Sequence, residues 1–178
     1  MAQIVDRMIR AAKLDPTLFD EVSRDESTMG EALTVVVIVS AASGIGLSLA
    51  GPLGLIGGAI AALVSWFIWA WLAFFVGTVM VPDSSTNTDL SAVLRVTGYA
   101  SAPGVISVLG LIPLLGPLAG LIASLWTLAA FVVAIRVVMN FESNGKAVLV
   151  CIAGWLVKMT IGGLFVLLGL GGALLLAT

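Results

Sequence analysis

Long apolar runs separated by short breaks dominate the chain after residue 27. A helix needs about 20 residues to cross a hydrocarbon core of about 30 Å. The pattern predicts five membrane-spanning helices, at about residues 30–50, 57–81, 98–112, 116–139 and 147–178. Residues 90–96 read as a juxtamembrane lead-in to the third. Two breaks are uncharged hairpin turns and two are polar loops, at 82–89 and 140–146.

The first 14 residues have a different, amphipathic pattern. At 100° per residue, one arc of a helix carries Ile4, Val5, Met8, Ile9 and Ala12, and the opposite arc carries Asp6, Arg7, Arg10 and Lys13. This arrangement suits a membrane surface with anionic lipid, so we expect Arg7, Arg10 and Lys13 at that surface. The alternative is an amphipathic helix packed on the protein's own cytoplasmic face or on a partner.

Two local signals mark where further helices begin. Asp15 followed by Pro16 predicts an N-cap and a first helical residue. Thr28 and Glu31 have the spacing of a capping box directly before the first apolar run. We therefore divide the chain into a cytoplasmic amphipathic helical segment, 1–27, and a five-helix transmembrane domain, 28–178.

Composition narrows the class of protein. Hydrophobic residues make up 60% of the chain and charged residues 10%, which is typical of a polytopic membrane protein and not of a soluble domain. Histidine is absent and Cys151 is the only cysteine, so we expect no metal, no cofactor and no intrachain disulfide. No basic run indicates nucleic acid, and no set of titratable groups indicates an enzyme.

The cations predict the orientation. With five spans and a cytoplasmic N-terminus, the cytoplasmic side receives Arg7, Arg10, Lys13, Arg24, Arg95, Arg136 and Lys146. The two hairpin turns on the opposite side carry neither lysine nor arginine. This distribution follows the positive-inside rule and places the C-terminus outside.

Two intramembrane features are candidate sites. Lys158 is an ionisable residue in the last apolar run, where it either lies inside the bilayer or extends its ammonium to the headgroups. Trp66, Trp69 and Trp71 lie well inside the second run. They either line a groove for a lipid, quinone or pigment, or serve core packing and lipid-facing bulk.

The segment from Gly98 to Trp155 carries a resemblance. Its features are Gly98-Tyr99-Ala100-Ser101-Ala102-Pro103, the hairpin turn with Ile112-Pro113 and Gly116-Pro117, Trp126, and Lys146-Ala147 leading to Gly154-Trp155. With these features the chain resembles the Yip1 domain family in its prokaryotic form, although the aspartate-leucine-tyrosine-glycine-proline motif of eukaryotic members is absent. The residues that we expect in helix packing and the family motif are Gly98, Tyr99, Pro103, Pro113, Gly116, Pro117 and Gly120.

The resemblance implies membrane organisation through protein partners, without catalysis. We therefore expect a scaffold or adaptor in a prokaryotic cytoplasmic membrane that contacts lipid and other membrane proteins, as a homo-oligomer or within a larger complex. One alternative is an accessory subunit of an energy-converting or pigment assembly. Another is a small transporter or channel, for which Lys158 and the proline-broken spans are the best features.

Overall fold

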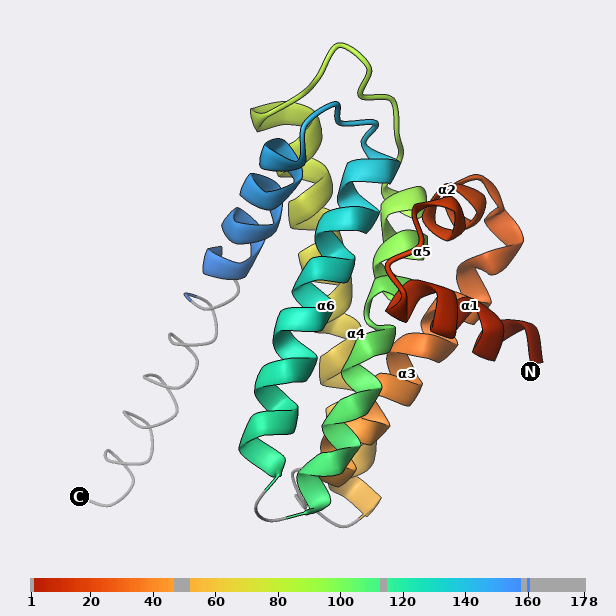
Figure 1. Ribbon diagram of the computed structural model, residues 1–178, viewed down its shortest axis with the longest axis vertical. Helices are drawn as coiled ribbons and strands as arrows, with labels where there is room; N and C mark the ends of the chain where they lie inside the picture. Colours follow the sequence, from red (N-terminus) through yellow and green to blue (C-terminus); the bar gives the residue numbers. More distant parts are fainter. Residues whose placement is uncertain (1, 47–51, 113–114, 158–159, 161–178) are drawn as a thin grey trace.

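The computed structural model describes residues 2–46, 52–112, 115–157 and 160, and over them the chain is helical without strands. Long helices stand side by side, and short N-terminal helices pack against one flank (Figure 1). The helices are α1 (Ala2–Ala12), α2 (Pro16–Arg24), the 3₁₀ turn η1 (Glu26–Thr28), α3 (Met29–Gly46), α4 (Pro52–Phe75), the π-helical η2 (Val76–Met80), α5 (Leu90–Ala100), the 3₁₀-helical η3 (Ala102–Leu111) and α6 (Gly116–Val138). A shorter apolar helix follows at Asn144–Val157.

Three stretches of the described residues are long and apolar enough to cross a membrane. They are Leu63–Met80, Leu90–Gly110 and Gly116–Val138. The last agrees closely with the fourth predicted span, because Pro117 occupies one of the first positions of the helix and the polar residues after Met139 end it. Together with the apolar helix at Asn144–Val157, they identify an all-helical membrane protein.

The candidate span Leu90–Gly110 corresponds to the third predicted span, at 98–112, but begins earlier than the sequence predicted. The Asp89 side chain accepts a hydrogen bond from the Ala92 backbone at 2.7 Å, and this N-cap starts α5 at Leu90. The predicted lead-in is therefore continuous with the span. After Ser101 the helix tightens into η3, where Pro103 occupies one of the first positions.

Helices α3 and α5–η3 run alongside each other in the same direction. A Cβ built on Gly98 would lie 2.8 Å from the Ala32 Cβ, and one built on Gly104 would lie 2.7 Å from Val39. Further along, the hydroxyls of Ser43 and Ser107 are 2.9 Å apart. The two glycines therefore allow close contact along one continuous seam.

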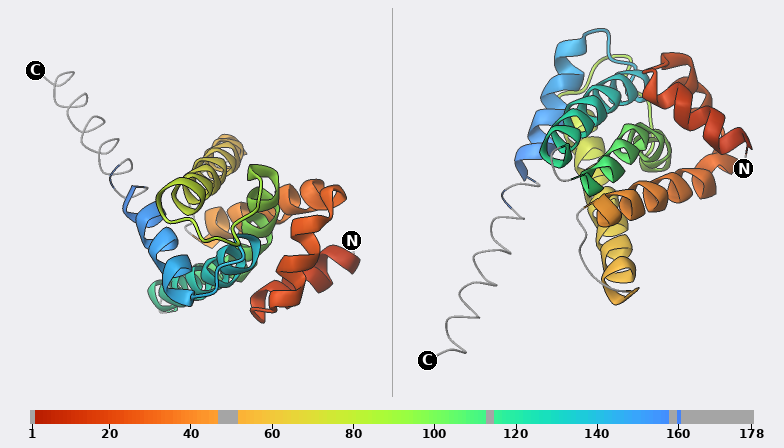
Figure 2. Two further views of the ribbon diagram at one scale, coloured as in Figure 1. Left: turned by 90° about the horizontal axis from the view of Figure 1, so that it is seen from above. Right: turned by 60° about the horizontal axis from the view of Figure 1, so that its bottom comes forward.

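The N-terminal helices share the core of the bundle. Leu18, Phe19 and Val22 of α2 are fully buried and belong to the same apolar cluster as α5 and α6. Seen along the bundle in Figure 2, α1 and α2 lie on one side of it. Both polar loops lie together at one end, where Lys146 pairs with Asp83 at 3.0 Å.

The predicted capping box does not form. The Thr28 hydroxyl instead donates to the Asp25 carbonyl at 2.7 Å, and Glu31 turns toward α1 and α5. Asp25 supplies the cap, since its carboxylate accepts from the Ser27 backbone at 3.0 Å. The extra 3₁₀ turn uses the hydrogen-bonding groups on which a capping box depends.

Candidate functional site

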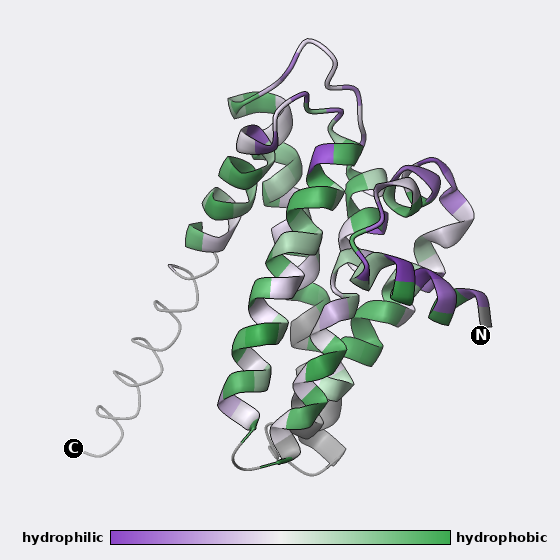
Figure 3. Ribbon diagram, viewed as in Figure 1, coloured by the Kyte–Doolittle hydropathy of each residue, from purple (hydrophilic) through white to green (hydrophobic). Residues whose placement is uncertain are grey.

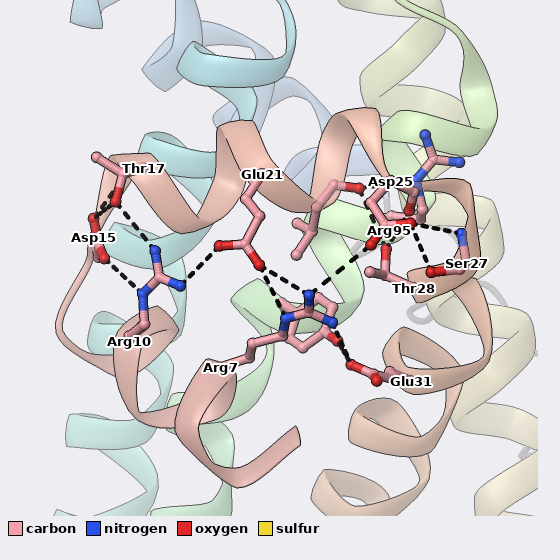
Figure 4. Close-up of polar contacts among 12 residues, drawn as sticks. Arg7, Arg10, Asp15, Thr17, Glu21, Asp25, Ser27, Thr28, Glu31 and Arg95 are labelled. Carbon is pink, nitrogen blue, oxygen red and sulfur yellow. Dashed lines mark hydrogen bonds and ion pairs between the residues drawn. The ribbon is translucent and has the colours of Figure 1, made fainter. Parts of the chain in front are cut away.

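A polar cluster fills the space between the N-terminal helices and the bundle (Figure 4). We call it the N-terminal polar cluster and define it by its members, which come from α1, α2, α3, α5 and the intervening turns: Arg7, Arg10, Asp15, Glu21, Asp25, Glu31 and Tyr99. It is the main concentration of ion pairs among the described residues.

Arg7 is the centre of this cluster. Its guanidinium donates to Glu21 at 2.9 and 3.2 Å and to Glu31 at 2.7 Å, and lies 3.9 Å from Asp25. The Tyr99 hydroxyl donates to the same Glu31 oxygen at 2.5 Å. Arg7 is only 7% exposed. It links α1 directly to α2 and α3, and α5 joins the cluster through the bond from Tyr99 to Glu31.

Arg10 forms the outer part of the cluster. It donates to Asp15 at 2.9 Å and to Glu21 at 2.8 Å. Hydrogen bonds from Thr17 and then Arg10 lower the pKa of Asp15 to about 2, and Arg10 followed by Arg7 lowers the pKa of Glu21. Burial alone would lower the pKa of Arg7, but its hydrogen bonds to Glu31 and Glu21 outweigh burial and raise it. All these groups are thereby held in their charged forms.

Arg95 makes a second buried link. Its guanidinium donates to the Val22 carbonyl at 3.0 Å, to the Ser23 carbonyl at 2.5 Å and to the Ser91 hydroxyl. These carbonyls belong to the last turn of α2, where a cation also complements the helix dipole. The sequence analysis used Arg95 only to orient the chain, and no local pattern pointed to this role.

The chemistry of these groups is that of structural links. Each cluster carboxylate accepts from an arginine, a hydroxyl or a backbone amide. Among the described residues, no buried side-chain nitrogen or oxygen lacks a hydrogen-bond partner. A general acid or base needs a group that faces a substrate, whereas these groups face each other.

The three residues expected at a membrane surface differ in how far they are exposed in the structure. Arg7 is buried in the protein, Arg10 is partly buried and Lys13 is exposed. The expectation for Arg7 is therefore corrected toward the alternative, packing on the protein's own face. The acidic residues at 15, 21, 25 and 31 were the sequence signal for this pairing.

Most residues of the expected motif lie at helix contacts. Gly98 packs against Ala32, Tyr99 and Pro103 are buried, and a Cβ on Gly116 would lie 3.2 Å from the Gly110 carbonyl oxygen. By contrast, Pro117 is exposed, and a Cβ on Gly120 would meet no atom within 4 Å. Pro113 and Lys158 lie outside the described residues.

The three tryptophans of α4 have different surroundings. The Trp66 indole donates to the Thr97 hydroxyl at 3.0 Å, and Trp69 packs on Phe131 with ring centroids 4.3 Å apart. Trp71 is exposed and stacks on Phe75 of its own helix. Trp66 and Trp69 therefore serve packing inside the bundle, and the three do not share one groove.

Comparison with known protein families gives a match over most of the chain. The profile of the Yip1 domain matches residues 15–168, which starts at the N-cap of α2 and covers most of the chain. No curated protein and no solved structure matches the chain. The matched region includes α2 and the buried contact of Arg95 with its C-terminal carbonyls.

Proposed function

The chain belongs to the Yip1 domain family, and on that premise we propose that it is a non-enzymatic scaffold or adaptor of a prokaryotic cytoplasmic membrane. It acts through contacts of its helices with lipid and with other membrane proteins. In this proposal five helices cross the membrane, the N-terminal segment is cytoplasmic and the C-terminus is outside.

The observation that carries the proposal is the division between the outside and the inside of the bundle. Large apolar side chains face outward on α4, α6 and the Asn144–Val157 helix, among them Phe67, Trp71, Phe75, Leu118, Leu121, Leu125, Ile152 and Trp155. Figure 3 shows this apolar character along the long helices. The charged groups of the N-terminal polar cluster, in contrast, form ion pairs with each other inside the protein.

Such an exterior fits lipid and the apolar surfaces of other membrane helices. The seam between α3 and α5–η3 already uses Gly98 and Gly104 for internal packing, so partner contacts fall to the bulky outer side chains. An accessory subunit of a larger assembly would use the same exterior, and the composition of the isolated complex distinguishes the two roles.

The test is native gel migration of the protein after gentle solubilisation of its own membranes, with mass spectrometry of whatever migrates with it. A scaffold or adaptor is expected in several species with different partners. One heavy band of fixed composition would identify an accessory subunit instead. Recovery only as a monomer without partners would contradict both roles.

A further inference from the structure

Helix α1 presents an unexpected side to the outside. Val5 is 55% exposed and Ile9 is 50% exposed, whereas Arg7 and Ala11 are buried. If hydrophobicity alone set the rotation of α1 on the protein, the two apolar residues would be buried and the arginine exposed. The pairing of Arg7 with Glu21 and Glu31 instead turns the arginine inward. Ile4 and Met8 still pack against the core, so only the edge of the apolar arc with Val5 and Ile9 faces outward.

The exposed side of α1 is itself divided into two adjoining arcs around the helix axis. Val5 and Ile9 lie about 40° apart on the helix circumference, and Lys13 and Asp6 follow on the adjoining arc. One edge of the exposed side is therefore apolar and the next is charged. This division is typical of a helix that lies in the plane of a membrane interface.

Trp126 fixes α1 against a candidate membrane span. Its indole N–H donates to the carbonyl of Ala12 at 2.7 Å, which satisfies one of the carbonyls left open at the end of α1. On the same helix, α6, Leu121 and Leu125 are both well exposed. The C-terminal end of α1 therefore contacts a helix whose exposed surface, under the proposed function, faces lipid.

The contact between Trp126 and α1 lies far from the end of the bundle that carries the polar loops. Trp126 lies 12 residues before the end of α6 at Val138, which corresponds to about 18 Å of helix. Figure 1 accordingly shows α1 beside the middle of the long helices. At the end of η2, however, Met80 is 66% exposed next to the polar loop. Apolar surface thus extends to the polar end on the η2 side but meets charged residues much earlier on the α1 side.

We propose that α1 is an interfacial helix of the folded domain, with Val5 and Ile9 in contact with lipid acyl chains and Lys13 at the level of the headgroups. The boundary of the hydrocarbon core then lies farther from the polar-loop end of the bundle at α1 than at Met80. This inference rests on the membrane placement in the proposed function. It specifies in addition which side of α1 contacts lipid.

The internal ion pairs determine which lipids matter. Arg7 and Arg10 are paired with Glu21 and Asp15, so they supply no unneutralised charge for anionic headgroups. The contact is then made mainly by apolar area, with Lys13 as a modest electrostatic addition. The depth of α1 is expected to be nearly independent of the content of anionic lipid.

Nitroxide depth measurements on the full chain in vesicles test the proposal. Single cysteines replace Val5, Ile9 or Lys13 in a Cys151→Ala background, with Leu125→Cys as the lipid reference and Ser84→Cys as the water reference. Val5 and Ile9 are exposed, so a label there does not displace packed side chains. Oxygen concentrates in the acyl region and a soluble nickel complex in water, so their collision rates report depth.

The oxygen-to-nickel ratio at Val5→Cys and Ile9→Cys is expected to lie several-fold above that of Ser84→Cys and close to that of Leu125→Cys, with Lys13→Cys between the references. Values like Ser84→Cys, or shielding from both reagents by a protein partner, would overturn the inference. If Leu125→Cys itself behaved as water-exposed, the membrane placement under the proposed function would fail first.

The same labels in vesicles with and without phosphatidylglycerol test the lipid requirement. Unchanged depth supports an apolar contact with the arginines paired internally. A marked deepening with the anionic lipid, lost in Arg10→Gln, would show instead that the arginines bind headgroups and would overturn the arrangement proposed for α1.

Discussion

At the scale of single residues, Arg7 is the clearest target. Its removal would leave Glu21 and Glu31 without their shared partner in a part-buried site. Loss of one partner from a buried pair costs about 3 to 5 kcal/mol, and both carboxylates remain partly exposed, so we expect Arg7→Ala to lower the free energy of unfolding by about 2 kcal/mol. Denaturant unfolding in detergent micelles measures this change.

Arg24→Ala is the matched control for this substitution. Arg24 also pairs with a carboxylate, Asp20 at 2.8 Å, but both side chains are exposed and four residues apart on α2. Its loss is expected to cost less than about 0.5 kcal/mol. Equal effects of the two substitutions would show that the N-terminal polar cluster does not stabilise the fold.

Gly98 permits a second prediction. The Cβ of Gly98→Ala would lie 2.8 Å from the Ala32 Cβ and 3.1 Å from its carbonyl oxygen, so α3 and α5 must separate. Such overpacking costs about 1 to 3 kcal/mol. Gly120→Ala is the control, because its Cβ meets nothing within 4 Å and helix propensity favours alanine by about 1 kcal/mol. The same unfolding measurement applies, and a neutral Gly98→Ala would contradict the tight seam.

At the scale of elements, α2 is fixed at both ends. Asp15 caps its N-terminus by accepting from the Thr17 backbone at 2.9 Å, and Arg95 binds the carbonyls of its last turn. Its apolar face, with Leu18, Phe19 and Val22, lies in the core between these two contacts. The helix is therefore held in place although it has only 9 residues, too few for stability in isolation.

Acid is expected to loosen this region first. The pKa of Asp15 is lowered from 3.8 to about 2, so its contribution to stability is complete above pH 3.8 and is lost as the pH falls toward about 2. Hydrogen exchange of the α1 and α2 amides, corrected for the intrinsic effect of pH, should show falling protection across this window. Asp15→Asn should start with lower protection and depend less on pH, and identical profiles would refute the assignment.

At the scale of the whole molecule, the two polar loops lie at the same end of the bundle (Figure 1). The Ser85 hydroxyl donates to the Asn140 carbonyl at 2.8 Å, and Lys146 pairs with Asp83, so the loops are joined to each other. The end of η3 and the start of α6, between which the hairpin turn was predicted, lie at the opposite end. This arrangement is what the proposed orientation requires of both loops.

A membrane-impermeant maleimide can test that arrangement in closed vesicles. With buried Cys151 replaced by alanine, Ser84→Cys and Ser143→Cys are expected to react from one side of the membrane and Ile112→Cys from the other. In the proposed orientation, the loop cysteines react from the cytoplasmic side. Reaction of all three positions from one side would contradict a crossing between the loops and the turn.

Features that depend on neighbouring residues were predictable from sequence. The apolar run from Gly116 and the cap at Asp15 gave the start of α6 and of α2, because helix caps and hydropathy act over a few residues. The family followed from residues between Gly98 and Trp155, and the profile match supports it. The capping box at Thr28 failed because a 3₁₀ turn competed for the same groups.

The sequence by itself thus determined an all-helical membrane protein of the Yip1 domain family, since hydropathy and local motifs are properties of the chain. Only the tertiary structure decided which side of α1 faces outward. Arg7 reaches Glu21 and Glu31, 14 and 24 residues away, and Tyr99 lies 68 residues from Glu31. Such pairings depend on how helices pack, because a charge turns toward its nearest counter-charge in space and not along the chain.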